Sequence, residues 1–260
     1  MSSDIDDPPM SLVAHLTELR DRLLRCVLAV LVAFIVPFMY ANEIYLFVSE
    51  PLRALLPPGT SMIATEVAAP FLVPFKLSVV TAIFIVVPYI LFQAWGFIAP
   101  GLYRHEKRFA IPILVSSILL FYAGVAFAYY LVFPLVFNFF ASVIPADIAY
   151  TPDINHYLDI VLKLFFAFGL AFEIPIATVL MIRTGITSPA TLSAKRPYII
   201  VGCFVVAMLL TPPDVFSQIL LAVPMWLLFE SGLWLGRWFE RDKIRDEETS
   251  EESEDTAEEE

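Results

Sequence analysis

Glu173 is the ionisable residue with the most unusual surroundings, because it lies inside an apolar run that covers residues 158–182. A carboxylate near the centre of a bilayer costs several kcal/mol, so this side chain should face water or a polar partner, or stay protonated. Pro175 follows closely and frees backbone groups that the same partner or water would satisfy. Within the chain, Gln218 and Thr211 are the candidate partners. Docking of a polar group, a proton relay and a purely structural acid are the three roles open to Glu173.

The other reactive residue types form no catalytic or metal-binding pattern. His15, His105 and His156 lie in separate segments without metal-ligand spacing, and the sequence has no phosphate-binding glycine loop or nucleophile motif. Cys26 and Cys203 lie inside apolar runs, where thiols usually act as small hydrophobic side chains. We therefore expect no enzyme activity, no cofactor and no metal site.

The segments that position these residues belong to a strongly apolar chain. Of its 260 residues, 59% are hydrophobic and only 17% are charged, which is too few to cover a water-soluble domain of this size. Six apolar stretches cover residues 24–41, 77–95, 109–133, 158–182, 198–210 and 217–235. The sequence predicts an all-α membrane protein with six transmembrane helices.

The fifth stretch is short, because Pro197 closes it on one side and Thr211, Pro212 and Pro213 close it on the other. At about 1.5 Å per residue it crosses only about two-thirds of a typical hydrocarbon core. We expect short fifth and sixth spans that form a shallow hairpin, with the bilayer thinned around them.

The distribution of basic residues predicts the orientation of the six spans. With the N-terminus inside, 13 of the 16 Lys and Arg residues fall on the cytoplasmic side, and only Arg53, Lys76 and Lys163 fall outside or near the outer ends of spans. This asymmetry follows the positive-inside rule. We expect both termini to be cytoplasmic.

Segments outside the spans have patterns of their own. Residues 1–23 form a cytoplasmic segment whose amphipathic helix pairs Glu18 with Arg22 at helical spacing, ahead of a transmembrane domain over 24–236. Residues 43–56 predict a short outer helix along the membrane surface, which Pro51 should kink. Residues 237–260 form an acidic tail that we expect to be disordered.

Several motifs, in order along the chain, closely resemble the TatC family of twin-arginine translocases. They run from about Leu12 to Arg237 and include His15-Leu16-Thr17-Glu18-Leu19-Arg20, Met62-Ile63-Ala64-Thr65, Phe97-Ile98-Ala99-Pro100-Gly101-Leu102, Phe172-Glu173-Ile174-Pro175, Lys195-Arg196-Pro197-Tyr198 and Leu209-Leu210-Thr211-Pro212-Pro213-Asp214-Val215-Phe216-Ser217-Gln218. The acidic tail is not a hallmark of that family.

The resemblance implies a core subunit of the bacterial inner membrane that carries folded proteins by using the protonmotive force. Its six spans would form a concave wall, and it would assemble with TatA- and TatB-like single-span proteins and with other copies of itself, but not with nucleic acid. Twin-arginine signal peptides would be recognised on the cytoplasmic face. The residues implied for this recognition are Glu18, Glu106, Phe97, Arg20 and Arg104, and we expect Arg20 to hold Glu18 in place.

The same resemblance extends the interpretation of Glu173. An open wall would let a partner's transmembrane helix bring a polar group to this acid. The residues expected around that docking site are Glu173, Gln218, Thr211, Asp214 and Met208.

Two other functions are consistent with parts of the sequence. An ion-coupled secondary transporter of small solutes would use intramembrane polar residues such as Glu173 and Gln218, although internal repeats are lacking. A structural scaffold for membrane assembly would bind no signal peptide. Binding of a twin-arginine peptide without solute uptake distinguishes the translocase from both.

Overall fold

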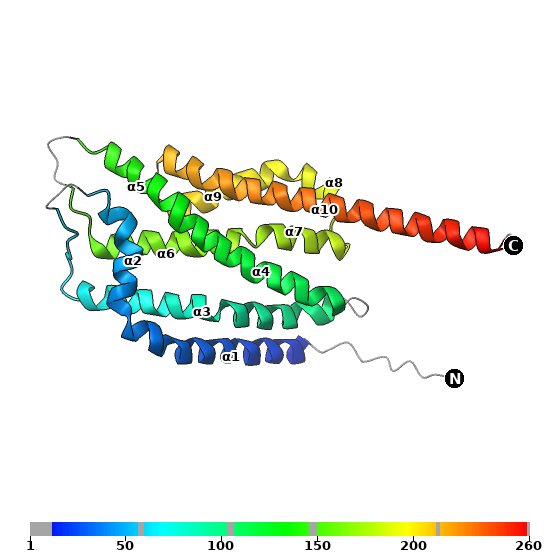
Figure 1. The fold of residues 1–260 in the computed structure, drawn as a ribbon, viewed down its shortest axis with the longest axis horizontal. Coiled ribbons are helices and arrows are strands. Elements are labelled where there is room, and N and C mark those ends of the chain that lie inside the picture. The colour runs from blue at the N-terminus through cyan, green and yellow to red at the C-terminus, as the bar shows by residue number, and fades with distance from the viewer. Residues whose placement is uncertain (1–11, 57–59, 103–106, 146–149, 212–213, 259–260) are drawn as a thin grey trace. The chain divides into compact units, whose positions relative to one another are not determined.

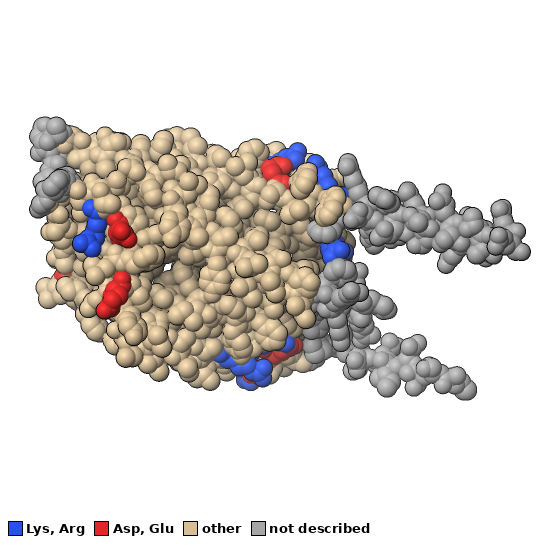
Figure 2. All heavy atoms as spheres, in the orientation of Figure 1, with Lys and Arg blue, Asp and Glu red and all other residues tan. Residues whose placement is uncertain are grey.

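The computed structural model describes residues 12–56, 60–102, 107–145, 150–211 and 214–258 (Figure 1). In this part of the chain the regular structure is helical, and β pairing is limited to an isolated bridge between Ile63 and Asp153. The predicted all-α class is confirmed. Figure 2 shows few charged side chains on a surface of otherwise uncharged residues, as expected where a protein meets lipid.

Five helical segments of the described chain are long and apolar enough to cross a membrane, and a further apolar helix is shorter. The long segments are Val13–Met39, Ala69–Phe97, Ile111–Ser142, Ile154–Arg183 and Val215–Trp238, and the short one is Arg196–Leu210. Together they account for the six predicted spans.

Backbone contacts divide the chain into two compact units. The first unit comprises residues 1–45 and 74–114, and its main elements are α1 (Leu12–Met39) and α3 (Ala69–Leu102). The predicted N-terminal amphipathic helix and the first span are one continuous helix, α1. Phe34 and Phe38 of α1 pack edge-on against Phe75 of α3, with ring centroids 5.5 and 6.3 Å apart.

The second unit comprises residues 46–73 and 115–260. Its later part contains α6 (Ile154–Ala171), α7 (Ile174–Arg183), α8 (Pro189–Ala194), α9 (Arg196–Leu210) and α10 (Val215–Glu258). Helix α10 packs mainly against α7 and α9 (Figure 1). Buried side chains from three of these helices form one cluster, made of Ile182, Leu192, Phe229 and Leu233.

Two spans are not the uninterrupted α-helices that the sequence predicts. The third span consists of α4 (Lys107–Phe127), a π-helical turn over Ala128–Val132 and α5 (Phe133–Ser142). The fourth span breaks at Phe172 and Glu173, between α6 and α7. Pro134 and Pro175 stand in the first turn of the helix after each irregularity, since proline lacks the N–H that would continue the preceding helix.

Helix α10 departs from two expectations. Its apolar part runs for 24 residues, so the fifth span is short but the sixth reaches normal length. The helix then continues to Glu258, whereas the sequence predicted a disordered tail from residue 237. A formed helix can extend into a glutamate-rich segment because elongation avoids the cost of nucleation and Glu has good helix propensity.

The outer amphipathic helix is α2 (Ala41–Arg53), with Pro51 inside it as predicted. Proline at position 51 cannot donate to the carbonyl of Phe47, one turn earlier. Instead, the Tyr129 hydroxyl donates to that carbonyl at 2.9 Å, and the Tyr129 ring stacks on Phe47. The next carbonyl, that of Val48, accepts from the Tyr157 hydroxyl at 2.7 Å. Two tyrosines therefore anchor α2 to the third and fourth spans.

Candidate functional site

A polar cluster at one end of the first unit contains Glu18, the acid that the sequence assigns to signal recognition. Glu18 and Arg22 lie four residues apart on α1 and form an ion pair. Arg22 donates from Nε at 2.8 Å and from Nη2 at 2.6 Å, and both bonds end on Oε1 of Glu18. Side-chain exposure is 28% for Glu18 and 23% for Arg22, so the pair is shielded but still reachable from solvent.

The other donors of Arg22 join α1 to α3. Nη2 donates to the carbonyl of Gly96 at 3.0 Å, and Nη1 donates to Oε1 of Gln93 at 3.1 Å. Gly96 leaves room for this contact, since a Cβ at that position would lie 2.6 Å from Nη1. The buried Gln93 in turn donates to the Tyr89 hydroxyl at 2.7 Å. One guanidinium therefore fixes Glu18 and the end of α3 relative to each other.

An aromatic contact lies beside this cluster. The rings of His15 and Phe97 stack with their centroids 4.2 Å apart and their planes 18° apart. Stacked aromatic pairs contribute about 0.5–1.5 kcal/mol beyond the area that they bury. The half-buried Phe97 therefore provides an apolar surface close to Glu18 on α1.

Arg20 was expected to hold Glu18 in place, but it does not. It pairs instead with Asp21 at 2.8 Å, and its side chain is 68% exposed. Residues 18 and 22 are one helical turn apart, whereas residues 18 and 20 point in different directions, so the helix selects Arg22. Glu106 and Arg104, the other two residues assigned to signal recognition, lie outside the described residues.

Glu173, in the second unit, lies at the break between α6 and α7. Its Oε1 atom is buried and has no hydrogen-bond partner. The hydroxyl of Ser117 is near enough to interact with the carboxyl group, but the geometry falls short of a hydrogen bond, and this hydroxyl too is buried and unpaired. The expected partners Gln218 and Thr211 make no hydrogen bond to Glu173 and use their polar groups elsewhere.

The polar residues expected around the docking site lie near the turn between α9 and α10. Gln218 donates to the carbonyl of Phe204 at 3.1 Å, and the Thr211 hydroxyl donates to the carbonyl of Ala207 at 3.0 Å. Asp214 accepts from the Ser217 N–H at the start of α10 at 2.7 Å, while its second oxygen is buried and unpaired. Met208 is 51% exposed on α9. The bonds of Gln218, Thr211 and Asp214 therefore stabilise the ends of α9 and α10.

A hydrogen-bonded cluster at the start of the fourth span was not predicted from the sequence. Asp153 caps α6 by accepting from the N–H groups of Asn155 and His156. Its other oxygen accepts from the Thr65 N–H and hydroxyl at 2.9 and 2.7 Å. These bonds hold the pKa of Asp153 well below its usual range. An Asp just before a helical run is a cap signal, but nothing in the sequence links it to Thr65.

Comparisons with known proteins agree with the motifs. The family model described as "Sec-independent protein translocase protein (TatC)" matches residues 14–224. A Sec-independent protein translocase protein TatC from Azotobacter chroococcum is 64% identical over 230 residues, covering 88% of this chain and 90% of that protein. One of the same name from Escherichia coli is 54% identical over 228 residues, covering 88% of each.

A solved structure gives the same result for the fold. The crystal structure titled as the twin arginine translocase receptor TatC aligns with a TM-score of 0.78 at 37% identity. The alignment covers 86% of this chain and 98% of that chain.

Proposed function

Because this chain belongs to the TatC family of Sec-independent protein translocases, we propose that Glu18 and Glu106 bind the paired arginines of a twin-arginine signal peptide. The chain is a non-enzymatic, multi-span membrane subunit of the twin-arginine translocation system. A solute transporter is not favoured by this membership. The geometry around Glu18 supports these roles for the site residues.

The observation that carries the proposal is the free oxygen of Glu18. Both bonds from Arg22 to Glu18 end on Oε1, so Oε2 has no partner among the described residues. An arginine of the signal can donate to Oε2 while Arg22 stays in place and keeps the carboxylate charged and oriented. Guanidinium groups bind carboxylates as a planar fork, which lysine cannot reproduce.

Partial shielding from water is needed for such an ion pair to contribute to peptide affinity. A fully exposed ion pair contributes only about 0–1 kcal/mol. Phe97 would pack against the apolar part of the signal and reduce the access of water to the guanidinium groups. Arg104 would complete the surroundings of Glu106.

The test is peptide binding to the purified protein in detergent. Glu106→Ala and Glu18→Ala should each abolish binding of a twin-arginine peptide. The helix content of the protein and its elution volume in size-exclusion chromatography should stay unchanged. A peptide with two lysines in place of the arginines is the matched control and should bind weakly to every variant. Normal binding of the twin-arginine peptide by both Glu variants would reject the proposal.

We infer further that single-span TatA- and TatB-like partners dock near Glu173 and the turn between α9 and α10. The unpaired Oε1 atom of Glu173 supports this, because a polar side chain from a partner helix would satisfy it. The exposed Met208 would offer that helix an apolar contact. A proton relay through Glu173 is the competing function, and the effects of Glu173→Ala on partner crosslinking and on export separate the two.

We also propose that the chain lies in the bacterial inner membrane with both termini cytoplasmic. The 13 basic residues assigned to one side of the membrane support this orientation. In a variant with Cys26 and Cys203 replaced by alanine, single cysteines at Asp147 and at Glu252 should react with impermeant reagents from opposite sides. Labelling of both from one side would reject the orientation.

A further inference from the structure

Three side chains of α1 share the face that meets α3 in the first unit. His15, Glu18 and Arg22 follow one another at spacings of three and four residues, so they form one stripe along the helix. Their contacts on α3 are neighbours in the sequence, since Arg22 donates to the carbonyl of Gly96 and His15 stacks on Phe97. Along α1, Glu18 therefore has a guanidinium on one side and a pair of stacked rings on the other.

The bonds from Arg22 fix the backbone of α3 but not the ring of Phe97. One of them ends on the carbonyl of Gly96, whereas the Phe97 side chain is only half-buried. A half-buried aromatic side chain can turn about its Cα–Cβ bond into another staggered rotamer. His15 limits this movement, because its ring lies 18° from parallel to that of Phe97, with the centroids 4.2 Å apart.

The ring at position 15 meets water as well as Phe97. His15 is exposed in the first turn of α1. An imidazole stacks as an aromatic ring and still presents its nitrogen atoms to water, which a purely apolar ring could not do. The contact with Phe97 therefore requires the flat ring of His15, while its nitrogen atoms suit the exposed position.

We propose that His15 is a positioning residue for signal recognition, which holds Phe97 beside Glu18 by stacking of the two rings. The inference rests on the proposed function of Glu18 and Phe97 and adds one requirement to it. Position 15 needs an aromatic ring, whether or not that ring can accept a proton. Without the stack, Phe97 divides its time among several rotamers, and the affinity for the signal peptide falls.

The test is titration of a labelled twin-arginine peptide into the purified full-length protein in detergent. His15→Ala should weaken binding about two- to tenfold, the range expected for loss of one stacked aromatic pair. His15→Phe should bind about as well as the unmodified protein, because it keeps the ring and removes the basic nitrogen. Thr17→Ala is the matched control on α1, since the Thr17 hydroxyl donates to the carbonyl of Val13 in the same helix, and it should bind normally.

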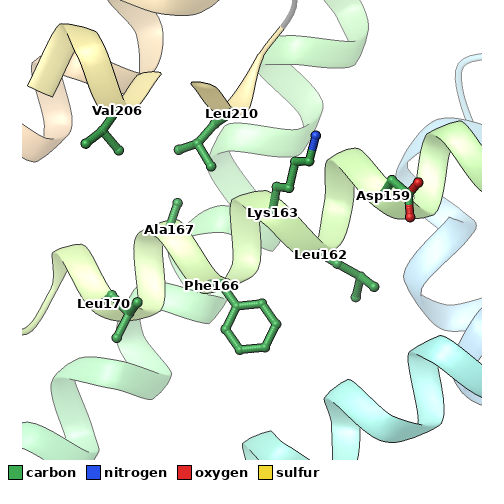
Figure 3. A pocket seen from close by; sticks show the side chains of 8 residues that line it. All are labelled: Asp159, Leu162, Lys163, Phe166, Ala167, Leu170, Val206 and Leu210. Atoms are coloured by element: carbon green, nitrogen blue, oxygen red, sulfur yellow. The ribbon is translucent and has the colours of Figure 1, made fainter. Parts of the chain in front are cut away.

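A double-mutant cycle shows whether His15 acts through Phe97. Phe97→Leu keeps an apolar side chain without a ring and should weaken binding by a similar factor. Adding His15→Ala to that variant should cause little further loss, because no ring is left to hold. Phe166→Leu is the matched control for removal of a ring, since Phe166 belongs to the second unit, where it lines a groove between α6 and α9 (Figure 3). It should bind the peptide normally.

Three results would overturn the role of His15. One is normal binding by His15→Ala. Another is an equal loss in His15→Ala and His15→Phe, which would assign the effect to the imidazole nitrogen atoms. The third is a double variant in which the two losses multiply, because His15 and Phe97 would then act independently. Circular dichroism of each variant checks that the fold is retained.

Glu18→Ala, measured alongside, separates these results from failure of the proposed function. Normal peptide binding by Glu18→Ala would reject the recognition site itself. Loss of binding in Glu18→Ala together with normal binding in His15→Ala would reject only the positioning role of His15.

Discussion

Arg22 bonds to Glu18 through one carboxylate oxygen only, and the same guanidinium caps the carbonyl of Gly96 on another helix. A bidentate fork would have saturated both oxygens of Glu18. The observed arrangement instead holds the acid still and leaves Oε2 open to a second donor. Arg22 is therefore a positioning residue for a carboxylate that is itself the proposed contact with the signal.

Arg22→Lys should weaken binding of a twin-arginine peptide about tenfold. Lysine keeps the charge, but its single nitrogen cannot reach Glu18, Gln93 and Gly96 together, and one charge-assisted bond is worth about 1.5–3 kcal/mol. Arg25→Lys, one turn along the exposed side of α1, is the matched control. Titration of a labelled peptide into the purified protein measures both. Equal losses of peptide binding in the two variants would mean that the bonds from Arg22 to Glu18, Gln93 and Gly96 are not the cause.

Glu173→Ala should reduce crosslinking of TatA- and TatB-like partners near the turn between α9 and α10, while binding of the signal peptide survives. The reason is that the variant removes the unpaired buried oxygen that a partner would satisfy. Site-specific crosslinking in membranes and export of a folded reporter are the two measurements. Unchanged crosslinks with export lost would favour the proton relay, and no change in either would leave Glu173 with a structural role.

Asp153 should make the stability of the second unit sensitive to acid. Folding lowers the pKa of this group, so its contribution is complete above the ordinary Asp pKa of about 3.9 and is lost as the pH falls through the folded value. Asp153→Ala should lower stability at pH 7 by about 1–2 kcal/mol through loss of the helix cap. Thermal unfolding in detergent between pH 7 and pH 3 measures this.

Asp153→Asn is the control for the acid effect. Its amide still offers an acceptor for the cap but does not titrate, so the decline in stability below pH 4 should be shallower than in the unmodified protein. Identical curves for the two would show that other carboxyl groups dominate acid unfolding.

Gly232→Ala should destabilise the packing of α10 against α7. A Cβ at this position would lie 2.6 Å from the Cα atom of Pro175, and backbone atoms cannot move aside as a flexible side chain could. We expect a loss of about 1–3 kcal/mol, the range for overpacking. Gly202→Ala in α9 is the matched control, since its Cβ would meet no atom within 4 Å, and it should be neutral or stabilising. The unfolding temperature should therefore fall in Gly232→Ala and stay unchanged or rise in Gly202→Ala.

The spans were predictable because length and hydropathy are local properties of the sequence. The brevity of α9 followed from Pro197 and from the prolines after Thr211, and Pro51 was correctly placed inside α2. The pairing of Glu18 with Arg22 was visible as helical spacing, although the resemblance directed attention to Arg20.

Features that depend on distant segments were not predictable. The bond from Arg22 to Gly96 joins residues 74 positions apart, and the bond from Asp153 to Thr65 joins residues 88 apart. The sequence suggested Gln218 and Thr211 as partners of Glu173, but each lies within reach of a nearby backbone carbonyl that it binds instead. A local pattern lists donors and acceptors without showing which carbonyls the fold brings close to them.

The extension of α10 has a practical consequence for experiments on this protein. About 20 residues of continuous helix follow the apolar part, from Trp238 to Glu258, and correspond to a rod about 30 Å long. A fluorescent domain fused after residue 260 would be carried on a stiff arm instead of a loose tether. Energy transfer from such a fusion would therefore report the tilt of the sixth span.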